Sequence, residues 1–369
     1  MARRSRVVLA LACLLLSTGF GPPQFLASDG SQLGLTAGQV RALQAYQAPV
    51  VTARAAVLLD AASGAVLYAK NGEQRVGPAS LTKMMTALVA AERGRLDQRI
   101  AATEHVRQVE PVNIGVDPGE VLSLEDLLYG LLLWSGNDAA VDIAEGLAGT
   151  LPQFVAWMNE KAAALGLRNT HFVNPHGLDV PGHYSTADDL GRLLVALMRQ
   201  PVLARMVGQR EYTIVGPPLY KFRNSNPLLG AYDGVDGGKT GLTDSCGRCL
   251  AVTAARGGHR VVVVVLGSQD VARDARTLLD FAFSSYDWIP VAARAQDAVV
   301  LQAGDEKVWA RPSADAAVAV AHWESPRLRA RVTVPDTSAG ADPPLARLVI
   351  ESALRRLGEF PLGRAEAGP

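Results

Sequence analysis

The chain has few cysteines and no excess of charge of either sign. Cysteine accounts for 3 of 369 residues, which excludes a small domain held together by several disulfides. Lys and Arg together number 36, Asp and Glu also number 36, and the formal net charge is +0. Proteins that bind nucleic acid usually carry a basic surplus that matches the phosphates. This balance therefore argues against nucleic acid as the main partner.

Long hydrophobic runs are missing as well. The apolar run at residues 7–16 is about half the length that a transmembrane helix needs. Arg3, Arg4 and Arg6 precede it, and Ala27-Ser28 follows it after small residues. That order is typical of a secretory signal peptide, so we expect residues 1–27 to be removed and the rest to fold outside the cytoplasm. A lipoprotein is the alternative, but the only nearby cysteine lies inside the run.

The remaining composition is that of a globular protein. Hydrophobic residues make up 49% of the chain and charged residues 20%, enough for a sizeable core and unlike a disordered chain. The length predicts one large domain with an appendage.

Two of the cysteines, Cys246 and Cys249, form a C-x-x-C pair. On a straight strand their Cα atoms would lie roughly 10 Å apart, whereas a disulfide needs less than about 7 Å. Bridging would therefore require a turn at Gly247. We interpret the pair as two packed thiols, with a redox role as a weaker alternative.

Apolar spacing predicts an α+β domain at residues 45–285, in which a helical block packs on an antiparallel sheet. Residues 54–71 are predicted as a hairpin, and the strands at 248–255 and 260–267 as a second one. A helix beginning at Pro78 carries apolar residues at helical spacing on a nearly apolar surface, so we expect it to be buried. The other helices are expected at residues 127–133, 138–147, 152–165, 186–199 and 272–285.

A smaller C-terminal part follows. Short apolar runs predict a small β-rich domain at residues 286–335. Residues 336–369 are predicted as a polar linker and an amphipathic helix. That helix has basic residues beside its apolar face, so it fits a surface-lying membrane anchor or an ordinary packing helix.

The strongest local signal is Ser80-Leu81-Thr82-Lys83, an S-x-x-K motif at the start of the buried helix. Residues three apart lie on one helix face, so the Lys83 amine can reach the Ser80 hydroxyl. A serine becomes a good nucleophile when a neighbouring base takes its proton, and burial makes lysine such a base by lowering its pKa. Alone, the motif is weak, because any Ser and Lys three residues apart match it.

Two further motifs follow along the chain. Ser135-Gly136-Asn137 stands between two predicted helices, where it is either a cap and turn or a pair of side chains presented to a cleft. Lys239-Thr240-Gly241 lies in a glycine-rich stretch, where it is either a solvated lysine beside a bulge or a site that holds a carboxylate.

Together, the order and separation of the three motifs match the triplet of penicillin-binding proteins and class A β-lactamases. The chain resembles the low-molecular-weight penicillin-binding proteins, the serine-type D-Ala-D-Ala carboxypeptidases (peptidase S11 family) of the bacterial cell wall. The resemblance covers about residues 50–285 and extends to the segments 174–179 and 183–190. It implies a β-lactamase/transpeptidase-like fold followed by a small β domain, no cofactor or metal, and action at the outer face of the cytoplasmic membrane, in the periplasm or in the cell wall.

The resemblance also implies roles for particular residues. Ser80 would attack the carbonyl between the two terminal D-alanines of a peptidoglycan stem peptide, with Lys83 as its base. Ser135 would pass a proton to the leaving D-alanine, and Asn137 would orient the peptide. β-Lactam antibiotics, which mimic the same dipeptide, would acylate Ser80.

The substrate-binding residues would be those of the third motif and the residue that follows it. The resemblance implies that Lys239, Thr240 and Gly241 hold the terminal carboxylate end of the peptide. The backbone N–H groups of Ser80 and Leu242 would form the oxyanion hole.

Several rival functions are open to the same residues. A D,D-endopeptidase would use the same site on cross-linked peptidoglycan, and a non-catalytic relative would bind the wall without cutting it. A class A-like β-lactamase needs a glutamate followed four residues later by asparagine, which this sequence lacks. A zinc peptidase built on His171, His176 and His183 would have spacings that fit no helical zinc motif.

Overall fold

The computed structural model describes residues 48–216, 218–291, 299–303, 306–312, 316–322, 329–333, 346–351 and 356–364. The predicted signal peptide lies outside these residues. The chain divides into two compact units, of which the larger comprises residues 49–61 and 66–282 and the smaller includes residues 62–65 and 283–369. Within the described ranges, no helix has the length and apolar character needed to cross a membrane.

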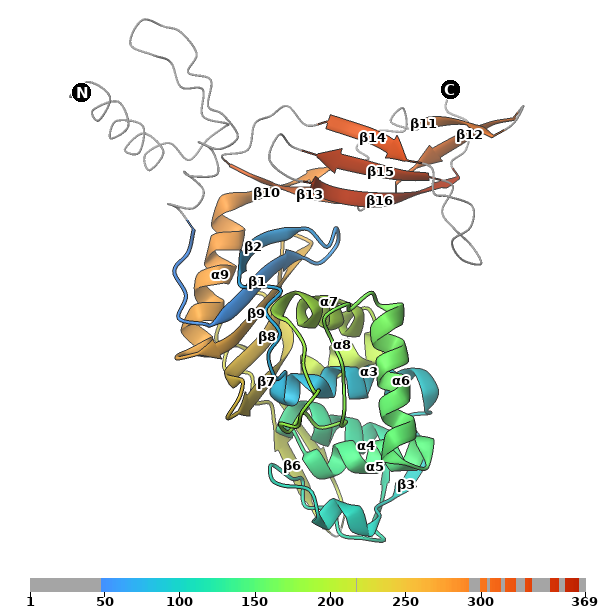
Figure 1. Cartoon of the computed structure of the whole chain (residues 1–369), viewed down its shortest axis with the longest axis vertical. Helices are drawn as coiled ribbons and strands as arrows, with labels where there is room; N and C mark the ends of the chain where they lie inside the picture. Colours follow the sequence, from blue (N-terminus) through green and yellow to red (C-terminus); the bar gives the residue numbers. More distant parts are fainter. Residues whose placement is uncertain are drawn as a thin grey trace, which may run out of the picture. The chain divides into compact units, whose positions relative to one another are not determined.

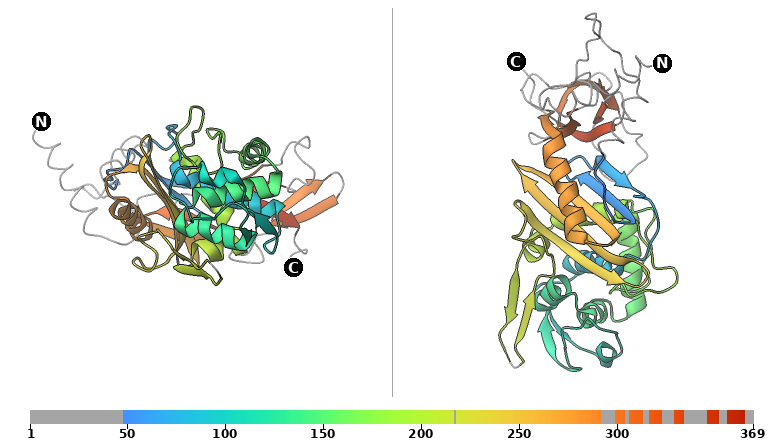
Figure 2. Two further views of the ribbon diagram at one scale, coloured as in Figure 1. Left: turned by 90° about the horizontal axis from the view of Figure 1, so that it is seen from below. Right: turned by 90° about the vertical axis from the view of Figure 1, so that its left-hand side faces the viewer.

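The larger unit is built on a five-stranded antiparallel sheet (Figure 1). Its helices lie on both faces: α7 (Ala187–Met198) contacts β1, β8 and β9, and α9 (Val271–Ser285) covers the opposite face in both Figures 1 and 2. The predicted antiparallel sheet with a helical block is confirmed. In spatial order the strands are β2 (Val66–Lys70), β1 (Ala55–Asp60), β9 (His259–Ser268), β8 (Gly247–Arg256) and β7 (Val235–Thr243).

The helical block surrounds α3 (Lys83–Arg93), whose residues 83–90 are all buried, as its apolar sequence predicts. Side-chain caps fix where its neighbours begin, because the Ser123 hydroxyl accepts from Asp126 N at 3.1 Å and Thr186 accepts from Asp189 N at 3.1 Å. The other helices are η1 (Ala79–Thr82), η2 (Glu104–Arg107), α4 (Leu124–Tyr129), η3 (Gly130–Trp134), α5 (Asn137–Ala148), α6 (Leu151–Ala164) and α8 (Pro201–Val207). Two short hairpins complete the unit: β3 (Arg99–Ala101) with β4 (Val121–Ser123), and β5 (Glu211–Ile214) with β6 (Tyr220–Arg223).

Beyond the end of α9, the smaller unit is built of two sheets in its described residues. One sheet pairs β10 (Tyr286–Pro290) with β13 (Ala317–Ala321). The other has the order β11 (Val299–Ala303), β12 (Glu306–Arg311), β16 (Arg356–Arg364), β15 (Ala346–Glu351) and β14 (Arg329–Thr333).

The predicted C-terminal amphipathic helix is wrong, because β15 and β16 occupy its positions as antiparallel strands. Ala346 and Leu348 are buried while Arg347 between them is exposed, which is the two-residue period of a strand. Apolar residues of β16 pack in the same core. The two apolar runs therefore form paired strands, and the helical spacing of their apolar residues in the sequence is coincidental. The predicted linker at 337–344 lies outside the described residues.

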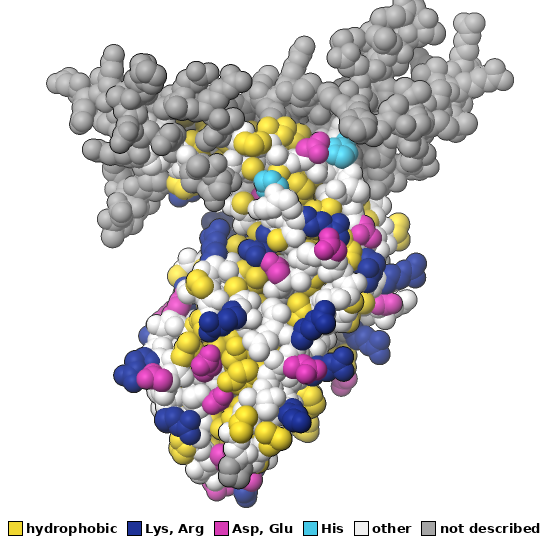
Figure 3. All heavy atoms as spheres, turned by 180° about the vertical axis from the view of Figure 1, so that it is seen from behind, with side chains coloured by type: hydrophobic (Ala, Val, Ile, Leu, Met, Phe, Trp, Pro, Cys, Tyr) yellow, Lys and Arg dark blue, Asp and Glu magenta, His cyan; other side chains and the backbone are white. Residues whose placement is uncertain are grey.

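Charged residues of both signs are mixed on the face of the larger unit that Figure 3 shows, without a broad area of one sign. This agrees with the balanced composition of the whole chain.

Candidate active site

The S-x-x-K motif stands where η1 passes into α3, beside strand β7. Ala79, directly before Ser80, has a left-handed φ of 50°, which turns the Ser80 side chain at the entry of the helix. Two glycines let other segments come close to this turn. A Cβ at Gly177 would collide with the Ala79 carbonyl oxygen, and one at Gly241 would lie 3.2 Å from Ser80 N.

Lys83 is fully buried, and its amine contacts three oxygen atoms. Nζ lies 2.9 Å from Ser80 Oγ, 2.6 Å from Asn137 Oδ1 and 2.7 Å from the His176 carbonyl oxygen. The Asn137 amide is held in this orientation because its Nδ2 donates to the Glu110 carbonyl at 2.7 Å. The structure thus brings the first and second motifs together around one amine.

Burial lowers the pKa of Lys83 well below its ordinary value, because the ammonium form is desolvated. The positive charge of Lys239 lowers it further, and the Asp138 carboxylate opposes both effects. The lowered pKa favours the neutral amine, which is the form that can accept a proton.

The third motif faces the second across the site. Lys239 Nζ donates to Ser135 Oγ at 2.9 Å, and burial lowers the pKa of Lys239 to about 7. Ser135 itself has φ 79°, at the break between η3 and α5 that the sequence predicted. Thr240 Oγ1 lies 2.6 Å from Ser225 Oγ. The predicted site residues therefore converge from η1, α3, the η3–α5 turn and β7.

Three contributions to the site were not predicted from the sequence. They are the His176 carbonyl at the Lys83 amine, the Ser225 hydroxyl at Thr240, and the Glu110 carbonyl at Asn137. Two of the three are backbone oxygens, which carry no signal in a side-chain pattern. Ser225 lies in a segment between β6 and β7 without a motif of its own.

The three histidines of the zinc alternative are occupied by protein contacts. Val173 N donates to His183 Nδ1 at 3.0 Å, which leaves Nε2 to donate to Thr82 Oγ1 at 2.9 Å. His171 Nδ1 lies 2.8 Å from the Gly182 carbonyl, and Leu178 N donates to His176 Nδ1 at 3.2 Å. Among the residues that the structure describes, no cluster of His, Cys, Asp or Glu could hold a metal ion.

The buried histidines predict a loss of stability in acid. Burial lowers the pKa of His183 to about 4 and that of His176 to about 3, so the unfolded chain binds these protons first and stability falls as the pH drops below about 6.5. Asp142 has the opposite effect on stability, because burial raises its pKa to about 7 and the folded chain therefore binds its proton first. This single proton offsets only part of the effect of the two histidines.

His183→Gln is therefore expected to reduce the difference in unfolding free energy between pH 6.5 and pH 4 by about 3 kcal/mol. Urea unfolding of both proteins at the two pH values measures this difference. An unchanged difference would show that His183 does not remain neutral in the folded state.

Cys246 and Cys249 form a disulfide, so the interpretation as two packed thiols is wrong. The backbone turns at Gly247, which has φ 72°, and the Cα–Cα distance is 7.0 Å, not the spacing of a straight strand. A register shift in β8 between Arg248 and Leu250 accompanies the turn. The disulfide closes the β7–β8 connection directly beyond the third motif.

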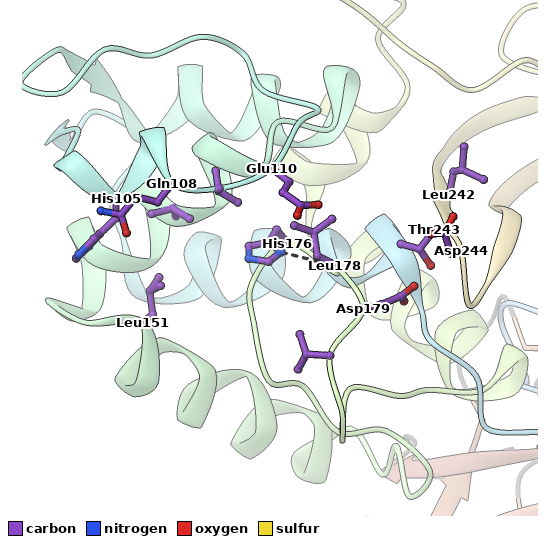
Figure 4. A pocket seen from close by; sticks show the side chains of 13 residues that line it. His105, Gln108, Glu110, Leu151, His176, Leu178, Asp179, Leu242, Thr243 and Asp244 are labelled. Atoms are coloured by element: carbon purple, nitrogen blue, oxygen red, sulfur yellow. Dashed lines mark hydrogen bonds between the residues drawn. The ribbon is translucent and has the colours of Figure 1, made fainter.

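A groove of about 680 Å³ adjoins the site (Figure 4). It runs between the segment at residues 105–110, the loop at 176–180 and the end of β7 at residues 242–244, with Val141 and Leu151 among its apolar residues. His176, whose carbonyl accepts from Lys83, lines this groove, and so does Leu242, which directly follows Gly241 at Ser80 N.

Comparisons with known proteins agree with the geometry. Residues 42–270 match the model of the peptidase S11 family, described as D-alanyl-D-alanine carboxypeptidase. D-alanyl-D-alanine carboxypeptidase DacF of Bacillus subtilis (strain 168) is 36% identical over 304 residues, which are 80% of this chain and 74% of that protein.

Two solved structures share the fold. The D-alanyl-D-alanine carboxypeptidase of Mycobacterium tuberculosis H37Rv matches with a TM-score of 0.61 and 35% identity over 64% of this chain and 92% of that one. Penicillin-binding protein 5 of Haemophilus influenzae matches with a TM-score of 0.70 and 27% identity over 86% of this chain and 98% of that one. The resemblance drawn from the three motifs is confirmed: the chain belongs to the peptidase S11 family of D-alanyl-D-alanine carboxypeptidases.

Proposed function

We propose that this D-alanyl-D-alanine carboxypeptidase works through a covalent acyl-enzyme on Ser80, with Lys83 as the general base. The observation that carries the proposal is the set of contacts at the Lys83 amine. A neutral amine has two N–H donors and one lone pair. Asn137 Oδ1 and the His176 carbonyl can only accept, so they take the two donors. The lone pair is left for the Ser80 hydroxyl, the one neighbour that can donate a proton.

Acylation then proceeds in two proton transfers. Lys83 takes the proton of Ser80 as Oγ bonds to the carbonyl carbon of the penultimate D-alanine. The tetrahedral oxyanion accepts from the N–H groups of Ser80 and Leu242, as the close approach of β7 to η1 at Gly241 allows. The C–N bond breaks as Ser135 relays the proton held by Lys83 to the leaving nitrogen, giving up its own hydroxyl proton and taking the one from Lys83, so that Lys83 is neutral again. In deacylation Lys83 takes a proton from the water that attacks the ester carbonyl and returns it to Ser80 Oγ as the bond between Oγ and the acyl group breaks.

The substrate carboxylate is held by the third motif. Lys239 and Thr240 supply the charge and a hydroxyl, and Ser225 lies beside them within 2.6 Å of Thr240. The pKa of Lys239, about 7 in the free protein because of burial, rises when a carboxylate binds, since the opposite charge favours the ammonium form.

The proposed setting is the bacterial cell wall. Peptidoglycan stem peptides ending in D-Ala-D-Ala are the substrate, and β-lactams are covalent inhibitors that open on the same serine. Because the chain lacks the glutamate pattern that activates a deacylating water in class A β-lactamases, the penicilloyl-enzyme persists. We propose residues 1–27 as a signal peptide for export to the outer face of the cytoplasmic membrane, the periplasm or the wall. The proposed catalytic domain is residues 45–285. The small β domain, predicted from the sequence at 286–335, extends beyond that limit, because β15 and β16 belong to the same sheet as β11, β12 and β14.

The function is tested by release of D-alanine from diacetyl-L-Lys-D-Ala-D-Ala. We expect stoichiometric D-alanine and the shortened dipeptide from the protein without residues 1–27. Cleavage of cross-linked dimers without any release from the tripeptide would replace the carboxypeptidase by an endopeptidase. Binding of wall fragments without cleavage of either would indicate a non-catalytic relative.

A further inference from the structure

The direction of a bound peptide follows from the proposed function. The terminal carboxylate lies at Lys239 and Thr240, and the reacting carbonyl lies at the N–H of Leu242. A peptide extended along β7 therefore runs antiparallel to it, with the acyl portion beyond Leu242. In the described sheet β7 is the last strand in the order, so one of its edges is open to such a peptide.

The third residue of the stem peptide consequently falls on the groove of Figure 4. At ~3.3 Å per extended residue, the residue before the penultimate D-alanine lies beside Thr243 and Asp244. Both residues line the groove, as do Glu110 and Asp179 from the segments opposite.

The groove is lined by negatively charged side chains. Its described lining contains three carboxylates, those of Glu110, Asp179 and Asp244, and none of these lining residues is Lys or Arg. Two histidines also line the groove: His176 adds no positive charge at neutral pH, because burial lowers its pKa to about 3, and His105 Nδ1 lies 2.6 Å from Glu145 Oε1, a carboxylate outside the lining. This contrasts with the mixed charge on the face of the larger unit shown in Figure 3.

The three carboxylates are not equivalent. Asp179 accepts from Ser245 N at 3.0 Å and from Ser245 Oγ at 2.6 Å, so it is used to fix the turn after β7. The side chains of Glu110 and Asp244 are exposed, and they stand on opposite sides of the groove in Figure 4. The Glu110 backbone is held by its bond to Asn137, which fixes the segment relative to the catalytic residues.

We infer that this groove receives the third residue of the stem peptide and that Glu110 and Asp244 select a side chain ending in a free ammonium group. The inference rests on the proposed function, because the peptide direction does. The three catalytic motifs do not determine this preference for the third residue. The exposed position of the carboxylates makes the preference one of moderate size and sensitive to salt.

The test compares two peptides that differ in one charge: Nα-acetyl-L-Lys-D-Ala-D-Ala, with a free ε-ammonium, and its Nα,Nε-diacetyl form. We expect kcat/KM of the unmodified protein to be about tenfold higher for the free-amine peptide, mainly through KM, and the ratio to fall at high salt. The double variant Glu110→Gln/Asp244→Asn should bring the ratio close to one. Asp97→Asn, which removes an exposed carboxylate outside the groove, should leave the ratio unchanged.

The outcomes separate the inference from the function on which it rests. Equal kcat/KM for the two peptides in the unmodified protein would overturn the inference and leave the carboxypeptidase intact. An unchanged ratio of the two kcat/KM values in the double variant would also overturn it. So would a ratio that falls as much in Asp97→Asn as in the double variant, because the preference would then come from the net charge of the molecule. No hydrolysis of either peptide would overturn both.

Discussion

Ser80→Ala is expected to lower kcat for D-alanine release by about 10⁶-fold, the size of loss seen when a serine hydrolase loses its nucleophile. The substitution removes only the Oγ that lies 2.9 Å from Lys83 Nζ, on a half-buried residue at the start of a rigid helix. Among the described residues, Ser80 is the only hydroxyl that forms a hydrogen bond with the Lys83 amine, so no other group can take its place.

The matched control is Ser284→Ala, which removes a hydroxyl from an exposed serine near the end of α9. It should keep full activity. Both proteins are assayed for D-alanine release and for thermal unfolding, so that a loss of fold is distinguished from a loss of chemistry. More than 1% of the original activity in a folded Ser80→Ala protein would refute Ser80 as the nucleophile.

Lys83→Arg and Lys83→Met are both expected to slow acylation by about 10²- to 10⁴-fold, the usual contribution of a general base. Arginine keeps a positive charge but stays protonated in proteins, so it cannot accept the Ser80 proton. If Lys83 served only as a buried charge, arginine would restore much of the rate. The rate of acylation by a β-lactam, measured under single-turnover conditions, reports this step alone.

The pH dependence of the same step provides a second readout. Because burial and the charge of Lys239 lower the pKa of Lys83, the acylation rate should rise with pH and reach its plateau well below pH 10.5. The rate rises with pH because the neutral amine is the active form. A rate that instead decreases through this range would mean that the protonated lysine is the active species.

The site could be predicted from the sequence because each motif lies on an element with a strong local signal. The break at Ser135-Gly136, the helix that begins near Ser80 and the glycines around Lys239 all mark positions where backbone conformation constrains the residue type. The contacts that complete the site are different. His176 O and Ser225 Oγ reach it from segments far away along the chain, and their positions depend on packing rather than on local patterning.

The two structural predictions that failed did so for related reasons. Residues 345–360 have apolar spacing compatible with either a helix or two strands, and pairing of β15 with β14 and β16 decides between them. The C-x-x-C distance was taken from a straight strand, whereas a left-handed Gly247 and a register shift in β8 bring the cysteines together. In both cases the deciding contact was not visible in the local sequence.

The most direct test of the acyl-enzyme is to locate the adduct that benzylpenicillin forms with the protein. Peptide mass mapping after brief incubation should find one penicilloyl group per chain, on the peptide that contains Ser80, and the adduct should be absent from Ser80→Ala. An adduct on another residue, or a fully unmodified chain after prolonged incubation, would contradict the account of Ser80 as the acylated nucleophile.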